Sequence, residues 1–202
     1  MDPAIESYRL LDIMPASGRM LTKIQSKPQQ ATVIETPFPK PWDKPRLIFV
    51  NFDLWSRLSQ HQRDILMLRT VCWQLNIQWF QVDIYQGLVA AGVLGTLFEL
   101  ALLDAVGTVI AGSLTGLAAA QIWRNQRSSQ SELLADESAI RVAGRRGYTE
   151  TEAAQNLLES IHMVAKIEGR PSLSFIELIR CQNLRAIAGL SALGVPEREI
   201  RE

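Results

Sequence analysis

The histidine and cysteine residues of this chain do not lie at spacings typical of a catalytic or metal-binding site. Neither His61 nor His162 has a second histidine four residues away. Cys72 and Cys181 are isolated, which excludes a zinc knuckle and a disulfide framework, and reduced thiols fit a cytoplasmic location. No glycine-rich phosphate loop follows a predicted strand, and no Ser/His/Asp set is apparent. The other candidates are two acids in an apolar segment, Glu99 and Asp104, which would relay protons only if buried in a membrane.

These two acids lie in the middle of a long segment without basic residues. The 54 residues 70–123 contain no Lys or Arg, and the stretches 84–98 and 105–123 are almost entirely apolar or small. Each stretch, extended by a few residues, reaches about 17–20 residues, enough for a helix to cross a hydrocarbon core about 30 Å thick. Arginines on both sides place the two flanks on the cytoplasmic side. The sequence therefore predicts a two-helix transmembrane hairpin over 81–123, with the acids at its tip.

The alternative for this segment is a helical hairpin buried in a soluble domain. Its glycines count against that interpretation, because Gly in a water-soluble helix costs up to about 1 kcal/mol, whereas membrane helices use small residues to pack closely. Gly112 and Gly116 form a GxxxG motif, and Gly87 and Ala91 form a similar pair. We therefore expect the lipid bilayer as a partner, and helix–helix contact through Gly112 and Gly116.

The charge balance excludes duplex nucleic acid as a partner. Lys plus Arg and Asp plus Glu both total 21, so the net charge is zero, and no basic stripe with interleaved aromatic residues is present. The length of 202 residues allows one domain plus the hairpin. The first eleven residues include Asp2, Glu6 and Arg9 and lack a continuous apolar core, which is not the pattern of a signal peptide.

Two short strands are predicted before the hairpin. Residues 1–30 form an N-terminal arm with one short helix, and prolines from Pro37 to Pro45 then enforce extended backbone. On either side of these prolines, 31–35 and 46–51 are rich in β-branched and aromatic residues, as strands are. The pattern predicts a small sheet or a hairpin.

The rest of the chain is predicted to be helical. Ser59 caps a helix over 60–74, Thr149 and Glu152 form a capping box, and helices are also predicted over 128–144 and 174–190. The predicted fold is mainly α with a small β-sheet (α+β) and an inserted transmembrane hairpin. Its predicted parts are an N-terminal arm (1–30), a cytoplasmic domain (31–80 with 124–202) and the hairpin (81–123).

Two regions of this framework resemble membrane-anchored zinc metallopeptidases of the HtpX and prenyl-protein endopeptidase type. The run 131–154 resembles the region in which that family carries its third zinc ligand, a Glu, followed by an Asp one turn later; Glu132 and Asp136 match these positions. The run 46–68 resembles the edge strand and short helix that lead into the family's active-site helix. The resemblance implies a degenerate, metallopeptidase-like domain, with peptides bound along the edge strand formed by Arg46, Leu47, Ile48, Phe49, Val50 and Asn51.

The helix that should hold the metal departs from the family's pattern. The family's His-Glu-x-x-His motif corresponds here to Arg69, Thr70, Val71, Cys72 and Trp73. Arg cannot ligate zinc, Thr cannot act as the general base, and Trp has no free lone pair to donate. We therefore expect no metal, no cofactor and no catalysis. The vestigial site consists of Arg69, Thr70, Trp73, Glu132 and Asp136.

The loss of the metal also predicts a contact. Arg69 and Glu132 stand at two positions that converge on one ion in the family, so we expect the guanidinium to pair with the carboxylate, with Asp136 able to accept a second hydrogen bond from the same Arg. The alternative is that Arg69 points toward lipid headgroups and Glu132 faces water.

A second resemblance covers more of the chain. Runs such as 14–19, 85–87 and 179–189 resemble an uncharacterised family associated with cyanobacteria and plastids. It implies integral membrane localisation, in the thylakoid or plasma membrane, with the domain on the cytoplasmic or stromal side. Together the two resemblances predict a pseudopeptidase that acts as a binding, scaffold or assembly factor for membrane-protein partners, such as photosynthetic complexes. The alternatives are an active, divergent membrane metallohydrolase and a structural subunit of a larger complex.

Overall fold

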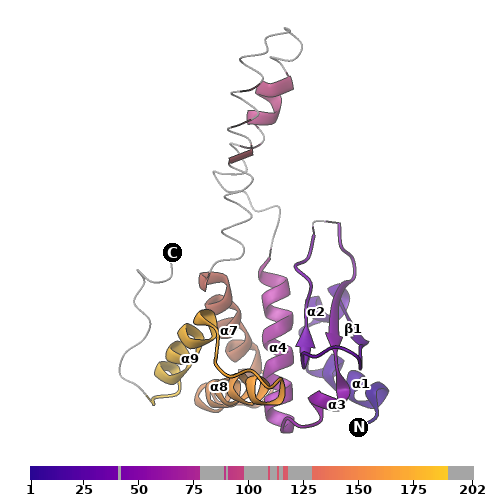
Figure 1. The fold of residues 1–202 in the computed structure, drawn as a ribbon, viewed down its shortest axis with the longest axis vertical. Coiled ribbons are helices and arrows are strands. Elements are labelled where there is room, and N and C mark those ends of the chain that lie inside the picture. Colours follow the sequence, from indigo (N-terminus) through magenta and orange to yellow (C-terminus); the bar gives the residue numbers. More distant parts are fainter. Residues whose placement is uncertain are drawn as a thin grey trace. The chain divides into compact units, whose positions relative to one another are not determined.

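The structure is a computed structural model that describes residues 1–40, 42–77, 89, 91–97, 109, 113, 116–117 and 129–190. The chain divides into two compact units. One comprises Met1–Ile77 and Ser129–Glu202, and the other comprises Gln78–Ser128. The first unit contains the helices and strands described below (Figure 1). In the second unit, the longest described run is the helical stretch 91–97.

A three-stranded sheet forms near the N-terminus of the first unit. Its strands are β1 (Thr22–Ser26), β2 (Ile34–Glu35) and β3 (Arg46–Val50), in the order β1-β3-β2. β1 runs parallel to β3 along its whole length, and β2 pairs antiparallel with the end of β3, placing Ile34 opposite Val50.

This strand order corrects two expectations. The predicted edge strand, with Arg46, Leu47, Ile48, Phe49, Val50 and Asn51, is the centre of the sheet, because β1 pairs with one side of it and β2 with the other. The second expectation concerns the N-terminal arm predicted over 1–30, because Thr22–Ser26 within it forms strand β1. Strand pairing involves residues far apart in the chain, so local composition does not reveal it.

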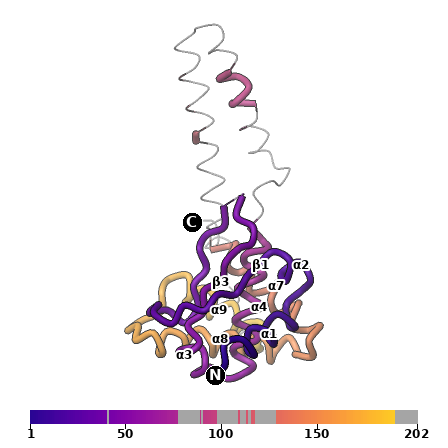
Figure 2. Tube along the Cα trace, turned by 90° about the vertical axis from the view of Figure 1, so that its right-hand side faces the viewer, coloured from indigo at the N-terminus to yellow at the C-terminus, as the bar shows by residue number. Residues whose placement is uncertain are grey.

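Helix α4 (Gln60–Asn76) is the central helix of this unit. It begins at Ser59, whose side chain forms a reciprocal capping box with Gln62, as predicted. Ten of its 17 residues are buried, so almost every face contacts another element. Figure 1 shows α4 between the N-terminal elements and the C-terminal helices, and Figure 2 shows the same unit with the N-terminal elements facing the viewer.

One hydrophobic core lies on the N-terminal side of α4. It packs α1 (Pro3–Ile13), the sheet and the short α3 (Phe52–Trp55) against α4, and the fully buried Trp55 is its largest side chain. Leu66, Met67 and Val71 are the residues that α4 contributes. The adjoining α2 (Ala16–Leu21) lies against α4 through Gly18.

A second core lies on the opposite side of α4. It is formed with α7 (Ser129–Gly144), α8 (Glu150–Ile167) and α9 (Phe175–Ile187). Ile65, Leu68 and Cys72 of α4 belong to this core. The predicted capping box of Thr149 and Glu152 is present at the start of α8, and Ser174 caps α9 in the same way.

The described residues include no helix that combines the length and the apolar character needed to cross a membrane. A span needs about 20 mostly apolar residues, whereas the 18-residue α8 contains Glu150, Glu152, Glu159 and Lys166. This finding corrects the predicted fold class with its inserted transmembrane hairpin, and with it the predicted membrane localisation. What the structure supports is a mainly helical fold with a small sheet.

Most of the segment 81–123, including Gly112, Glu99 and Asp104, lies outside the described residues. Gly116 is described, and a Cβ built on it would meet nothing within 4 Å. The close helix contact expected at Gly116 is therefore not found among the described residues.

The contact between α2 and α4 yields a first prediction. A Cβ built on Gly18 would lie 2.5 Å from Cγ1 of Val71, which is too close for an unshifted core. Gly18→Ala should therefore lower the free energy of unfolding by about 1–3 kcal/mol, even though Ala is the better helix former. Urea denaturation measures the change. Gly144→Ala is the control, because a Cβ there meets nothing within 4 Å; equal effects of the two substitutions would contradict the tight packing at Gly18.

Candidate functional site

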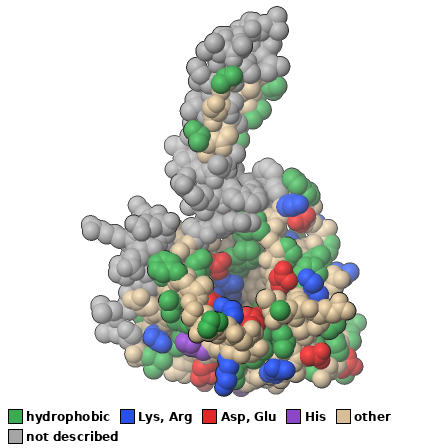
Figure 3. All heavy atoms as spheres, viewed as in Figure 1, with side chains coloured by type: hydrophobic (Ala, Val, Ile, Leu, Met, Phe, Trp, Pro, Cys, Tyr) green, Lys and Arg blue, Asp and Glu red, His purple; other side chains and the backbone are tan. Residues whose placement is uncertain are grey.

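The candidate site is a cavity of about 460 Å³ in the first unit. Its wall comes from α4, α7, α8, α9, the turn after α8 and the segment around β2. Figure 3 shows a hollow on this face with acidic and basic side chains in its wall. The lining residues are Thr32, Ile34, Thr36, Leu66, Arg69, Thr70, Trp73, Glu132, Ile161, Val164, Glu168, Arg170, Glu177 and Arg180.

Four of the five predicted vestigial-site residues line this cavity. Arg69, Thr70 and Trp73 reach it from α4, and Glu132 reaches it from the first turn of α7. The ion pair predicted between Arg69 and Glu132 is present, with the two side chains 14% and 20% exposed. The structure therefore brings together residues that are more than 60 positions apart in the chain.

The fifth residue, Asp136, lies behind this pair and is fully buried. Arg69 Nε donates to its Oδ1 at 3.3 Å, while Arg180 Nε and Nη2 donate to Oδ2 and Oδ1 at 2.8 and 2.9 Å. Opposite charges thus alternate along a chain of four residues, Glu132–Arg69–Asp136–Arg180, whose formal charges sum to zero. Two cations and two anions buried side by side compensate one another, so none is left without a counter-charge.

Burial and the nearby charge of Arg180 lower the pKa of Arg69 to about 10, although Asp136 opposes this shift. Arg69 therefore still carries its charge at neutral pH. Thr70, the next residue, donates its hydroxyl to the carbonyl oxygen of Leu66 at 2.8 Å, so its hydrogen is used within α4. The resemblance assigns a metal ligand to the position of Arg69 and the general base to that of Thr70. The first position carries a positive charge, and the hydroxyl at the second is bonded within α4.

Sequence reasoning missed Arg180. On α9 it lies between the buried Ile179 and Cys181 and is only 8% exposed. A charged residue on an apolar helix face signals a buried partner. The partner could not be named from sequence, because Asp136 is 44 residues away on another helix.

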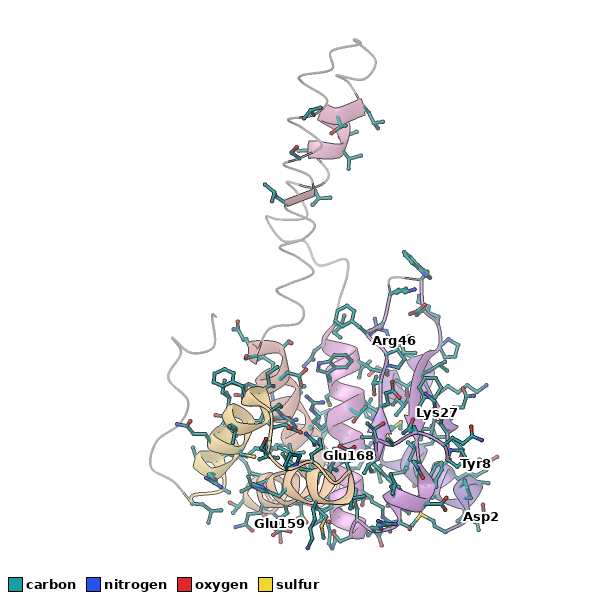
Figure 4. The ribbon with its side chains drawn as sticks, in the orientation of Figure 1. Asp2, Tyr8, Lys27, Arg46, Glu159 and Glu168 are labelled. Carbon is teal, nitrogen blue, oxygen red and sulfur yellow. The ribbon has the colours of Figure 1, made fainter. Side chains whose placement is uncertain are left out.

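A second ion group, formed by Glu168, Arg170 and Glu177, also lines the cavity. Arg170 Nη1 and Nη2 donate to the two carboxylate oxygens of Glu177 at 2.7 and 2.8 Å, and Arg170 Nε lies 2.9 Å from Glu168. Glu168 also accepts a hydrogen bond from the backbone N–H of Val33 at 2.8 Å. Glu168 is labelled in Figure 4 at the end of α8. This group anchors the segment that leads into β2 against α8 and the turn that follows it.

The remaining chemistry-bearing residues lie elsewhere. His61 Nδ1 lies 3.0 Å from the Tyr148 hydroxyl, which donates to Asp64, and His162 Nε2 lies 3.9 Å from Cys181 Sγ. Burial raises the pKa of the Cys72 thiol to about 11, although Arg69 opposes the shift, which suits a core residue rather than a nucleophile. Within the described part of the chain, no group of three or more His, Cys, Asp or Glu residues could hold a metal ion.

The strand expected to bind peptides does not reach the cavity. Ile48 and Val50 are buried in the N-terminal core, and Asn51 caps α3. Arg46, labelled in Figure 4, donates to the backbone carbonyls of Gln74 and Ile77. The strand that contributes to the lining is β2, through Ile34.

The Arg69–Glu132 pair predicts a non-additive response to mutation. Arg69→Ala leaves Glu132 and Asp136 with one cation fewer, whereas Arg69→Ala combined with Glu132→Ala restores the balance of charge. The single variant should therefore be less stable than the double variant, because a buried charge without its partner costs more than the loss of the whole pair. Urea denaturation of the two variants compares them. A double variant that is the less stable of the two would contradict this account.

The second ion group predicts a pH dependence. Burial alone raises the pKa of Glu177, but the hydrogen bonds from Arg170 and Ser174 lower it from 4.5 to about 2. Because the folded-state pKa is the lower one, the stabilisation is complete above about pH 4.5 and disappears as the pH falls toward 2. Glu177→Gln should flatten this part of the stability curve, measured by thermal unfolding at a series of pH values. An unchanged slope in the variant would contradict the ion pair.

Comparison with known proteins identifies a family but no individual relative. No curated protein and no solved structure matches the chain. One family matches residues 8–148, well over half of the chain, and is described as a protein of unknown function, DUF3318. The matched range contains Arg69, Glu132 and Asp136, whereas Arg180 lies beyond it. The chain therefore belongs to the DUF3318 family of proteins of unknown function.

Proposed function

We propose that this chain is a non-catalytic, metallopeptidase-like protein that works by binding, as a scaffold or assembly factor for partner proteins. One observation carries the proposal. Arg69, Thr70 and Trp73, at the three positions of the zinc motif, line one cavity together with Glu132, at the position of the third ligand. A zinc site needs its ligand positions around one cavity, and the side chains at these four positions cannot hold or use the metal.

The ion pairs in the cavity favour binding over catalysis. A hydrolase needs a base with a free lone pair or a metal-activated water close to the substrate. Here the carboxylate of Glu132 is paired with Arg69, and that of Asp136 with both Arg69 and Arg180. Carboxylates held in these ion pairs are not free to take a proton from a substrate or a water molecule.

The segment around β2 supports an extended peptide as the bound group. Thr32, Ile34 and Thr36 alternate along this segment and all line the cavity. In the described sheet, β2 pairs with β3 at Ile34 and Glu35 and is an outer strand. An outer strand beside a cavity is the usual arrangement for strand addition, in which backbone hydrogen bonds hold the peptide and pockets select alternate side chains. The resemblance to cyanobacterial and plastid proteins directs the search for partners to photosynthetic complexes.

Restoring the motif tests the proposal. The variant Arg69→His/Thr70→Glu/Trp73→His places two histidines one turn apart, facing Glu132. We expect the purified variant to bind one zinc ion per chain, measured by atomic emission, and the wild type to bind none. Adding Glu132→Ala to the variant is the matched control and should abolish the binding.

Two outcomes would contradict the proposal. Stoichiometric zinc in the wild-type protein would favour the alternative of an active, divergent metallohydrolase. A triple variant that keeps its helical circular dichroism but binds no zinc would show that these four positions are not a former metal site. Both outcomes are read from metal content, with circular dichroism as the check on folding, and neither requires knowledge of the partner.

A further inference from the structure

The cavity wall contains hydrogen-bond donors that lack an acceptor. Trp73 Nε1 is buried, and no described residue accepts its hydrogen; the hydroxyl of Thr32 is buried and unpaired among the described residues as well. The indole N–H can only donate, and leaving a buried donor unsatisfied costs about 1–3 kcal/mol. The Trp73 ring is held by an edge-to-face contact with Phe38, at 6.0 Å between ring centroids. Thr32 and Trp73 both line the cavity, and a ligand whose acceptor reaches these groups would satisfy them.

Glu132 is the anion of the cavity that a ligand can replace. Its side chain is 20% exposed, and Arg69 is its ion-pair partner among the described residues. Asp136 differs, because it is fully buried and held by Arg69 and by two hydrogen bonds from Arg180. Glu132 can therefore turn toward solvent at low cost and leave Arg69 Nη2 free to donate, while Asp136 remains in place.

The charges select the class of ligand. With Glu132 in place, the four-residue ion chain is neutral. A ligand carboxylate that replaces Glu132 on Arg69 keeps that neutrality and forms a strong, charge-assisted hydrogen bond. Leu66, Ile161 and Val164 line the same cavity and offer apolar contact to the rest of the ligand.

We propose that the cavity binds the carboxylate of a peptide, with Arg69 and the indole N–H of Trp73 as donors, and that this carboxylate displaces Glu132. The inference rests on the proposed peptide-binding function and names what that function recognises. The carboxylate comes either from the carboxyl end of the chain or from an Asp or Glu side chain, and the experiment separates the two sources.

The indole resonance of Trp73 in a proton–nitrogen NMR spectrum reports binding and is assigned with Trp73→Phe. Three mixtures of random hexapeptides serve as probes. The first has free carboxyl ends and no acidic residues, the second is the same mixture with carboxamide ends, and the third has carboxamide ends with one Asp or Glu at each position in turn. We expect the first mixture to move the resonance, the second to leave it in place, and a response to the third to identify acidic side chains as a further source.

Substitution of Glu132, the group that the ligand displaces, tests the displacement itself. Glu132→Gln removes the competing charge and should lower the Kd for the free-carboxyl mixture several-fold. Glu137→Gln, at an exposed position on the same helix, is the matched control and should leave the Kd unchanged. Weaker binding by Glu132→Gln would overturn the displacement.

The outcomes distinguish a failure of carboxylate recognition from a failure of the proposed peptide binding. Equal shifts of the resonance with all three mixtures would overturn carboxylate recognition and leave peptide binding intact. No response to any mixture would overturn both, while the zinc content of the restored motif would still test the origin of the site.

Discussion

Replacing Arg180 by Ala should lower the free energy of unfolding by about 3–5 kcal/mol, because the change leaves a fully buried carboxylate without its main partner. Asp136 is 0% exposed and receives two hydrogen bonds from Arg180, at 2.8 and 2.9 Å. The hydrogen bond that remains, from Arg69 Nε to Asp136 Oδ1, is longer at 3.3 Å, and Arg69 also forms an ion pair with Glu132. One guanidinium cannot compensate two carboxylates as well as two can.

Urea denaturation measures this loss, and two further variants identify its cause. Arg180→Lys keeps the charge but not the two-pronged geometry, so it should fall between the wild type and Arg180→Ala. Adding Asp136→Ala to Arg180→Ala removes the stranded charge and should recover part of the lost stability. A change below about 1 kcal/mol for Arg180→Ala would show that Asp136 does not depend on it.

Leu68→Ala should cost about 2–5 kcal/mol through the cavity that it creates in the C-terminal core. Leu68 is completely buried on α4, in a cluster with Ala139, Leu157 and Leu184 from three other helices. The surrounding helices cannot collapse into the space without losing their contacts with one another. The same variant should leave the carboxylate-binding cavity in place, because Leu68 does not line it.

Leu178→Ala is the matched control for this prediction. Leu178 lies on α9, but its side chain is 54% exposed, so the same truncation should change the free energy of unfolding by no more than about 0.5 kcal/mol. Both variants are measured by urea denaturation, and the two curves are fitted with the same dependence of the free energy of unfolding on urea concentration. Equal effects at the two positions would contradict the position assigned to Leu68.

Local signals in the sequence predicted α4, α7, α8 and α9, whereas the N-terminal arm, where one short helix was expected, contains both α1 and α2. The caps at Ser59 and Thr149 define where α4 and α8 begin, because a side chain that bonds to the third residue after it acts within one turn. The strands at 31–35 and 46–51 were predicted from composition, and the structure places β2 and β3 inside these ranges. The predicted Arg69–Glu132 ion pair was confirmed, although the two residues are far apart in the chain and the expectation came from a resemblance rather than from a local signal.

The membrane hairpin and the edge position of β3 were the wrong predictions. Apolar composition and a gap in basic residues satisfy the length rule for a span, but they do not by themselves establish one. The edge position failed for a different reason, since β1 is polar and exposed on most of its length and gave no strand signal. Whether a strand is central depends on which segments pair with it, and pairing is a long-range property.

The sequence by itself determined where α4 and α8 begin and that no His-Glu-x-x-His motif is present, since both follow from side-chain type and short spacing. Only the tertiary structure decided that Arg180 completes the ion chain, that β2 rather than β3 lines the cavity, and that Trp73 and Thr32 carry buried donors without a described acceptor. The physical reason is that burial of a charge or a donor depends on groups brought from distant parts of the chain, and helix packing alone sets which of them meet.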